Sequence, residues 1–222
     1  MALAEWRKPS SGVTGGALHM AAGVGLAVAA TELLPRAQEL VAIWLVAFAF
    51  VIGGGVSVAI AAVAQRIRGS KDGAEERGWG AHTAITLDLF TDGLMTGGGA
   101  AVAGPLGILL ATSQIIGNLP GGFAITAAFR DSRVKPRARL LAALAYFVAP
   151  LIGGLVGYVL LNGAGELAKG AVLAVFAGIL LTATIEDLLP EADAPDTPRH
   201  LSSPAFAVGF AVLLLMSACI GA

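Results

Sequence analysis

Residues 88–122 read DLFTDGLMTGGGAAVAGPLGILLATSQIIGNLPGG, in which two apolar segments meet at a turn over residues 103–105. Asp88 and Asp92 are four residues apart and therefore share one face of a helix, as do Gln114 and Asn118 in the second segment. The short turn makes the two helices antiparallel neighbours, so four oxygen-bearing side chains can face one another. A carboxylate in the middle of a membrane span costs ~2.5–3.5 kcal/mol, and two on one face predict a compensating cation.

The composition places the chain among integral membrane proteins. Of its 222 residues, 56% are hydrophobic and 13% are charged, whereas an ordinary soluble domain is about 25% charged. The net charge of −1 gives no indication of nucleic-acid binding, and the single cysteine excludes an internal disulfide. An enzyme is not expected, because no nucleophile–base pair or phosphate loop is present, so no catalytic residue is predicted. The 30 glycines favour closely packed helices, and we expect one all-α transmembrane domain over residues 1–222.

Seven stretches are long enough to cross roughly 30 Å of hydrocarbon. They cover residues 14–34, 40–64, 81–102, 105–129, 138–161, 167–189 and 204–221. The loops at residues 65–80 and 130–139 contain nine of the fourteen basic residues, and alternating spans put both loops on one side. The positive-inside rule then predicts a cytoplasmic N-terminus and an external C-terminus, in a bacterial inner membrane. Membrane lipid is an expected partner, with anionic headgroups against the two basic loops.

The first and sixth stretches repeat each other. The segments AAGVGLAVAATELLPRA at residues 21–37 and FAGILLTATIEDLLPEA at residues 176–192 align without gaps at an offset of 155 residues and share seven identities. Because the two spans run in opposite directions, we predict an inverted repeat, a common architecture of alternating-access transporters. Glu32, Glu186 and Asp187 precede the prolines that are expected to end the two helices. Either interfacial hydration or a mouth that gathers cations explains these acids.

Pro120 interrupts the second segment of the central stretch. It lacks an amide hydrogen, so the helix should bend there and the carbonyl of Ile116 should lose its partner. That carbonyl, the two carboxylates and the two side-chain amides supply about five oxygens and no nitrogen. Such a set suits Mg²⁺, Ca²⁺ or Mn²⁺ better than zinc, which favours nitrogen and sulfur donors. The alternative is a polar cluster without metal, in which the aspartates hydrogen-bond to Thr91 and the two amides to fix packing.

Several segments resemble the ZIP family of divalent-metal transporters. They are DGLMTGG at residues 92–98, NLPGGFA at residues 118–124, LAALAYFVAPLIGGLVGY at residues 141–158, and the LLP endings of the first and sixth stretches. The resemblance implies the helical bundle of that family and covers nearly the whole chain. It begins at the family's second helix, so the first helix is expected to be missing.

The resemblance to the family's metal site is partial. The family's fourth helix usually reads His-Asn-x-Pro-Glu-Gly where this chain has DLFTDG at residues 88–93, and its fifth reads His-Glu-Ile-Pro-Glu-Gly where this chain has GNLPGG at residues 117–122. The resemblance therefore implies ligand positions at Asp88, Asp92 and Asn118. In contrast, Gly117 and Gly121 have no side chain to bind metal, and Ala149 replaces an acidic residue often found in the sixth helix.

We therefore predict ZIP-like divalent metal transport, with the metal ion (Mn, Fe, Mg or Zn) as substrate. The predicted site consists of Asp88, Asp92, Gln114 and Asn118. The alternative is a non-transporting ZIP-derived subunit packed into a larger membrane complex, which would account for the lost ligands and the lost first helix. The sequence leaves open which metal is carried, which ion couples to it, and whether the chain forms a homodimer or a larger complex.

Overall fold

The computed structural model describes residues 11–69, 74–131, 136–193 and 198–221, and side chains are described for these residues except 11, 67–69, 74–78, 81, 119–131 and 136–139. This part of the chain is helical and contains no strand. The helices are α1 (Ser11–Ala27), η2 (Val28–Leu33), α2 (Leu34–Leu40), α3 (Ile43–Gly69), α4 (Ala74–Val102), α5 (Gly104–Asp131), α6 (Pro136–Leu161), α7 (Glu166–Ala183), η3 (Thr184–Leu188), α8 (Leu189–Asp193) and α9 (Arg199–Ile220).

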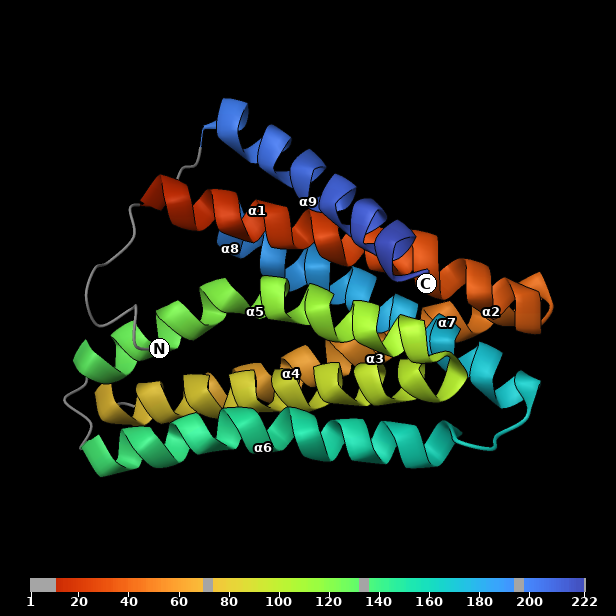
Figure 1. Cartoon of the computed structure of the whole chain (residues 1–222). Helices are drawn as coiled ribbons and strands as arrows, with labels where there is room; N and C mark the ends of the chain where they lie inside the picture. Colours follow the sequence, from red (N-terminus) through yellow and green to blue (C-terminus); the bar gives the residue numbers. More distant parts are fainter. Residues whose placement is uncertain (1–10, 70–73, 132–135, 194–197, 222) are drawn as a thin grey trace.

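The π-helices η2 and η3 are continuous with the α-helices on either side, so the described residues form seven rods (Figure 1). Successive rods run in alternating directions, and α1 begins at the opposite end of the bundle from the end of α9 (Figure 1). Only Ala103 separates α4 from α5: its amide donates to the Gly99 carbonyl at 2.9 Å and its carbonyl accepts from the Gly107 amide at 3.2 Å. The predicted all-α bundle of about seven helices is confirmed.

The two copies of the sequence repeat have matching boundaries. Leu34 begins α2, which follows α1, and Leu189 begins α8, which follows α7; these two starts are separated by 155 residues. Each copy places a π-helix at the same point between these helices. Since α1 and α7 run in opposite directions (Figure 1), the predicted inverted repeat is confirmed.

The prolines of the two copies do not end their helices, contrary to the sequence-based expectation. Pro35 lies in the first turn of α2, which continues to Leu40, and Pro190 lies in the first turn of α8. A proline is tolerated in a first turn because its missing amide hydrogen has no intrahelical partner there. The preceding π-turn provides this position, because it changes the hydrogen-bond register of the rod just before the proline.

The two copies also cross their neighbouring helices in the same way. A Cβ on Gly23 of α1 would overlap the Phe206 carbonyl oxygen of α9, and a Cβ on Gly178 of α7 would overlap the Phe50 carbonyl oxygen of α3. The reverse contacts match as well, with Gly209 against Met20 and Gly53 against Val175. Only glycine permits such close backbone approach, which stabilises helix pairs that have no hydrophobic driving force in lipid. The repeat therefore extends to the partners of both copies.

A third glycine-mediated contact joins α4 to α6, where a Cβ would overlap the opposite backbone at Gly93, Gly97, Gly153 and Gly157.

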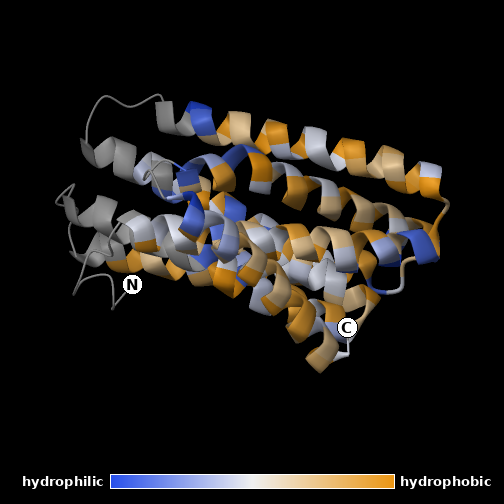
Figure 2. Cartoon of the chain, turned by 90° about the horizontal axis from the view of Figure 1, so that it is seen from above, coloured by the Kyte–Doolittle hydropathy of each residue, from blue (hydrophilic) through white to orange (hydrophobic). Residues whose placement is uncertain are grey.

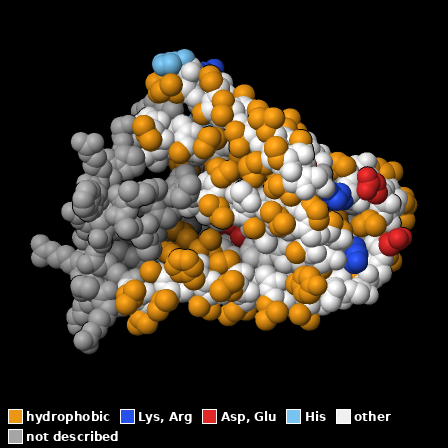
Figure 3. All heavy atoms as spheres, in the orientation of Figure 1, with side chains coloured by type: hydrophobic (Ala, Val, Ile, Leu, Met, Phe, Trp, Pro, Cys, Tyr) orange, Lys and Arg blue, Asp and Glu red, His pale blue; other side chains and the backbone are white. Residues whose placement is uncertain are grey.

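The outside of the bundle is apolar: Trp44 is 70% exposed, Phe147 72% and Leu215 68%. Figure 3 shows hydrophobic side chains over much of the described part of one face, with charged groups gathered toward one end. Within the described residues, five rods are long and apolar enough to span a membrane: Gly12–Leu40, Ile43–Arg66, Leu140–Leu161, Glu166–Asp193 and Arg199–Ile220. The chain is an integral membrane protein.

Candidate metal site

A cavity of about 690 Å³ lies between α1, α3, α4, α5 and the rod formed by α7, η3 and α8. Its lining extends from Met95, two turns before the end of α4, to Gln65 near the end of α3. Figure 2 shows hydrophilic residues inside the bundle, while the outer helices are mainly hydrophobic. The described lining residues include the carboxylates Asp88, Asp92, Glu186, Asp187 and Glu191, and no Lys, Arg or His. The described wall of the cavity is therefore strongly negative.

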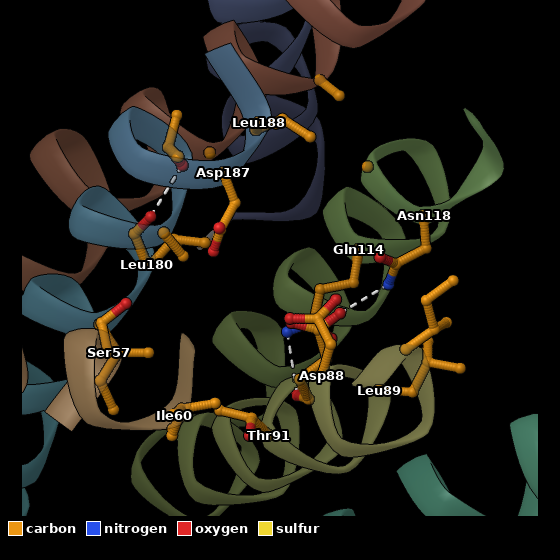
Figure 4. Close-up of a pocket in the computed structure, with 18 of the residues that line it drawn as sticks. Ser57, Ile60, Asp88, Leu89, Thr91, Gln114, Asn118, Leu180, Asp187 and Leu188 are labelled. Carbon is orange, nitrogen blue, oxygen red and sulfur yellow. Dashed lines mark hydrogen bonds between the residues drawn. The ribbon is translucent and has the colours of Figure 1, made fainter. Parts of the chain in front are cut away.

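The deep part of the cavity contains a hydrogen-bonded cluster between α4 and α5. The Nδ2 of Asn118 donates to the Oδ2 of Asp92 at 2.6 Å, and the Nε2 of Gln114 donates to the Asp92 carbonyl oxygen at 2.9 Å (Figure 4). The hydroxyl of Thr96 donates to the Oε1 of Gln114. The antiparallel hairpin and the four-residue spacing on each helix produce this arrangement, as the sequence predicted.

Asp88 lies one turn before Asp92 on α4 and is exposed at the cavity wall. All four residues predicted for the site, Asp88, Asp92, Gln114 and Asn118, line this one cavity. Thr91 is buried, and its hydroxyl donates to the Leu87 carbonyl of its own helix at 3.1 Å. It therefore stabilises α4 locally and does not bridge the carboxylates.

The wall opposite the cluster comes from the second copy of the repeat. Glu186 and Asp187 of η3 and Glu191 of α8 line the cavity, and Figure 4 shows Asp187 across the space from Asp88 and Gln114. The sequence offered either hydration or a cation-gathering mouth for Glu186 and Asp187, and their place on the cavity wall supports the second. Glu186 and Asp187 lie on the π-helix η3, and no spacing rule in the sequence indicates where that π-helix forms.

Glu32, the acid at the equivalent place in the first copy, is in different surroundings. It is 5% exposed, and its Oε2 lies 3.7 Å from a guanidinium nitrogen of Arg36. Its Oε1 also accepts a hydrogen bond from the Thr31 hydroxyl at 3.4 Å. The expectation of interfacial hydration is therefore wrong for Glu32, because η2 turns it into the bundle beside a cation from the next helical turn.

The donors available to a metal are two carboxylates and two amides. Over the described residues, no group of three or more His, Cys, Asp and Glu side chains could hold a metal ion. A carrier needs to release its cargo as well as bind it, so a small ligand set is compatible with transport.

The helix α5 is continuous through position 120 and its ribbon changes direction along its length (Figure 1), but the side chain of Pro120 lies outside those described.

Sequence reasoning missed Thr96 and Ser57. Thr96 follows Asp92 by four residues, so the same spacing rule that joined Asp88 to Asp92 indicates it. Ser57 lies on α3 and lines the cavity, but nothing in its sequence neighbourhood points to the site.

A comparison with known families finds a match. The family model described as ZIP Zinc transporter matches residues 64–217, which is more than half of the chain. No curated protein matches the sequence. The family match begins near the end of α3 and therefore leaves out the first copy of the repeat, at residues 21–37. That copy is recognised by its similarity to the second copy in sequence and structure.

Proposed function

The chain belongs to the ZIP family, whose members transport divalent metal ions, and we propose that it carries such an ion through the acid-lined cavity as a single domain over residues 1–222. The observation that supports this proposal is the cavity itself. Five acidic side chains line it, and the described lining contains no Lys, Arg or His. Its deep part contains Asp92, which accepts a hydrogen bond from Asn118. A cleft of one charge sign concentrates ions of the opposite sign and speeds their entry.

The proposed ligands are Asp88, Asp92 and Asn118. The Nδ2 of Asn118 donates a hydrogen bond to the Oδ2 of Asp92, which leaves the amide oxygen of Asn118 as the atom that can bind metal. Gln114, which the sequence predicts as a fourth ligand, is left out of the proposed set because its oxygen already accepts from the Thr96 hydroxyl. These donors are all oxygens, so the preferred substrate is a hard ion that keeps some of its water, such as Mn²⁺ or Mg²⁺, ahead of Fe²⁺ and Zn²⁺.

The proposed path has its mouth at the end of the bundle where α3 and α5 end and where α4 and α6 begin. The two basic segments, residues 65–80 and 130–139, lie at this end and include the last residues of α3 and α5 and the first residues of α4 and α6. Under the positive-inside rule this end is cytoplasmic, and the end of α9 is outside a bacterial inner membrane. Glu186, Asp187 and Glu191 would then collect or release the ion on the cytoplasmic side.

The test is Mn²⁺ uptake by proteoliposomes that contain the purified full chain and a Mn²⁺-sensitive dye. Asp88→Asn and Asp92→Asn keep the shape of each side chain and remove its charge, so each should reduce uptake at least tenfold, about 1.4 kcal/mol. Glu166→Gln is the matched control, because Glu166 is an exposed acid at the start of α7, outside the cavity lining. It should leave uptake unchanged.

Uptake that both aspartate variants retain at the unmodified rate would contradict the proposal. A chain that neither binds nor carries Mn²⁺, Mg²⁺, Fe²⁺ or Zn²⁺ would instead support a ZIP-derived subunit of a larger membrane complex. The observation in favour of that second candidate is the loss of family ligands at Gly117 and Gly121.

A further inference from the structure

Gln114 makes an unusual contact with α4. Its amide nitrogen donates to the Asp92 carbonyl oxygen at 2.9 Å, and its amide oxygen accepts from the Thr96 hydroxyl. In an α-helix the carbonyl of residue 92 points toward residue 96, so one side-chain amide from α5 binds two neighbouring polar groups of α4. Both polar ends of Gln114 are used in this bridge.

The same turn of α4 is also held by Asn118. Its nitrogen donates to the Oδ2 of Asp92 at 2.6 Å, one turn along α5 from Gln114. Asp92 therefore receives one hydrogen bond from α5 on its backbone and another on its carboxylate. The backbone contact fixes the position of Asp92 along the axis of the neighbouring helix α5. The carboxylate contact fixes the direction of the Asp92 side chain.

Gln114 and Asn118 differ in which atom they leave for a cation. The oxygen of Gln114 accepts from Thr96, whereas Asn118 uses its nitrogen on Asp92. An amide oxygen that serves as a ligand gains from facing the cavity with its lone pairs, and the Thr96 hydroxyl takes up part of that capacity in Gln114. The hydrogen bonds thus suit Asn118 to binding and Gln114 to holding the helices in register.

We propose that Thr96 and Gln114 form a positioning clamp that holds Asp92 at the distance from Asn118 and Asp88 that a divalent cation requires. This inference rests on the proposed function, because it assigns a role around the same cation site. Neither Thr96 nor Gln114 touches the ion. Their contribution is preorganisation: ligands held in place by surrounding hydrogen bonds bind more tightly than ligands that must be ordered on binding.

The test is the affinity of the purified full chain for Mn²⁺, measured by isothermal titration. Thr96→Val keeps the side-chain shape and removes the hydroxyl, and Gln114→Leu removes both ends of the bridge. Each should weaken Mn²⁺ binding about fivefold to tenfold, which is about 1.0–1.4 kcal/mol. The double variant should be no weaker than the weaker single variant, because both changes break one bridge.

Two matched controls separate the clamp from general damage. Thr96→Ser keeps the hydroxyl and should bind Mn²⁺ within twofold of the unmodified chain. Thr112→Val removes a hydroxyl of α5 that donates to the Ile108 carbonyl, away from the cavity lining, and should also leave affinity unchanged. Variants are compared only if they keep the elution volume of the unmodified chain, and Gln114→Met replaces Gln114→Leu if the latter does not.

The outcomes distinguish the clamp from the site it serves. If Thr96→Val binds Mn²⁺ as well as or better than the unmodified chain while Gln114→Leu weakens binding, then the Gln114 oxygen is a ligand and the clamp is wrong. If neither variant changes affinity but Asp92→Asn abolishes binding, the clamp is wrong and the proposed function stands. An unmodified chain that binds none of Mn²⁺, Mg²⁺, Fe²⁺ and Zn²⁺ overturns the proposed function, and the clamp with it.

Discussion

The π-helices η2 and η3 occupy the same place in the two copies of one repeat, but their acids have opposite surroundings. Glu32 of η2 is 5% exposed and lies beside Arg36, whereas Asp187 of η3 is exposed on the cavity wall. At the offset of 155 residues, the position of Arg36 in the first copy is taken by Glu191 in the second. The acid of the first π-helix is therefore paired with a basic residue, whereas both equivalent positions in the second copy are acidic.

This difference shows that two copies with the same packing can differ in charge. The packing is shared, since both copies cross their partners through glycines at equivalent positions. The charges are not shared, and like charges at short range favour hydration and separation. The two copies therefore share their packing, and the exchange of a basic for an acidic residue makes the second copy's wall of the cavity more acidic.

The largest expected effect comes from breaking the shared packing. Gly53→Ala would place a Cβ against the Val175 backbone, and Gly209→Ala would do the same against Met20 in the other pair. Backbone cannot move aside as a side-chain end can, so each should destabilise the protein by roughly 3 kcal/mol, at the upper end of overpacking effects. Thermal unfolding in detergent measures this, and the two variants should lose similar stability.

The control for this prediction lies two residues away on the same helix. A Cβ on Gly55 meets nothing within 4 Å. Gly55→Ala should therefore leave stability unchanged or raise it by up to ~1 kcal/mol, because alanine is the better helix former. Equal stability of Gly53→Ala and Gly55→Ala would show that the close crossing of α3 and α7 is not required.

The next effect concerns the exposure of the two acids. In a Cys219→Ser background, which removes the exposed native thiol, a cysteine at position 187 should react with a polar maleimide at least ~30-fold faster than one at position 32. A buried thiol reacts only when the structure opens locally, and a 30-fold ratio corresponds to about 2 kcal/mol of opening free energy. Equal labelling rates would contradict the difference between the two ends.

The sequence predicted the shared features of the two copies better than their differences. The LLP endings and the ungapped alignment indicated the repeat, and the four-residue spacings brought Asp88, Asp92, Gln114 and Asn118 to one cavity. It could not predict the π-helices, because a change of hydrogen-bond register leaves no periodic signal in so short a segment. For the same reason it missed that Glu32 turns inward, and it placed helix ends at Pro35 and Pro190.

The smallest expected effect separates the charges from the packing. Arg36→Gln removes the cation 3.7 Å from Glu32, and Glu191→Gln makes the equivalent change in the second copy. The Arg36 side chain is 25% exposed, so water screens the pair, yet Glu32 is nearly buried and loses its partner. We therefore expect Arg36→Gln to cost about 1 kcal/mol, near the top of the range for partly exposed ion pairs.

Glu191→Gln should change stability by no more than ~0.5 kcal/mol, because Glu191 is exposed and the residue equivalent to Glu32 in its copy is the like-charged Asp187. The difference is measurable as a lower unfolding temperature for Arg36→Gln in low salt, and salt should narrow it because screening weakens the pair that only the first copy possesses. If Glu191→Gln were as destabilising as Arg36→Gln, the two ends would not differ in their electrostatics. The different exposure of Glu32 and Asp187 would then have to come from packing differences between the copies.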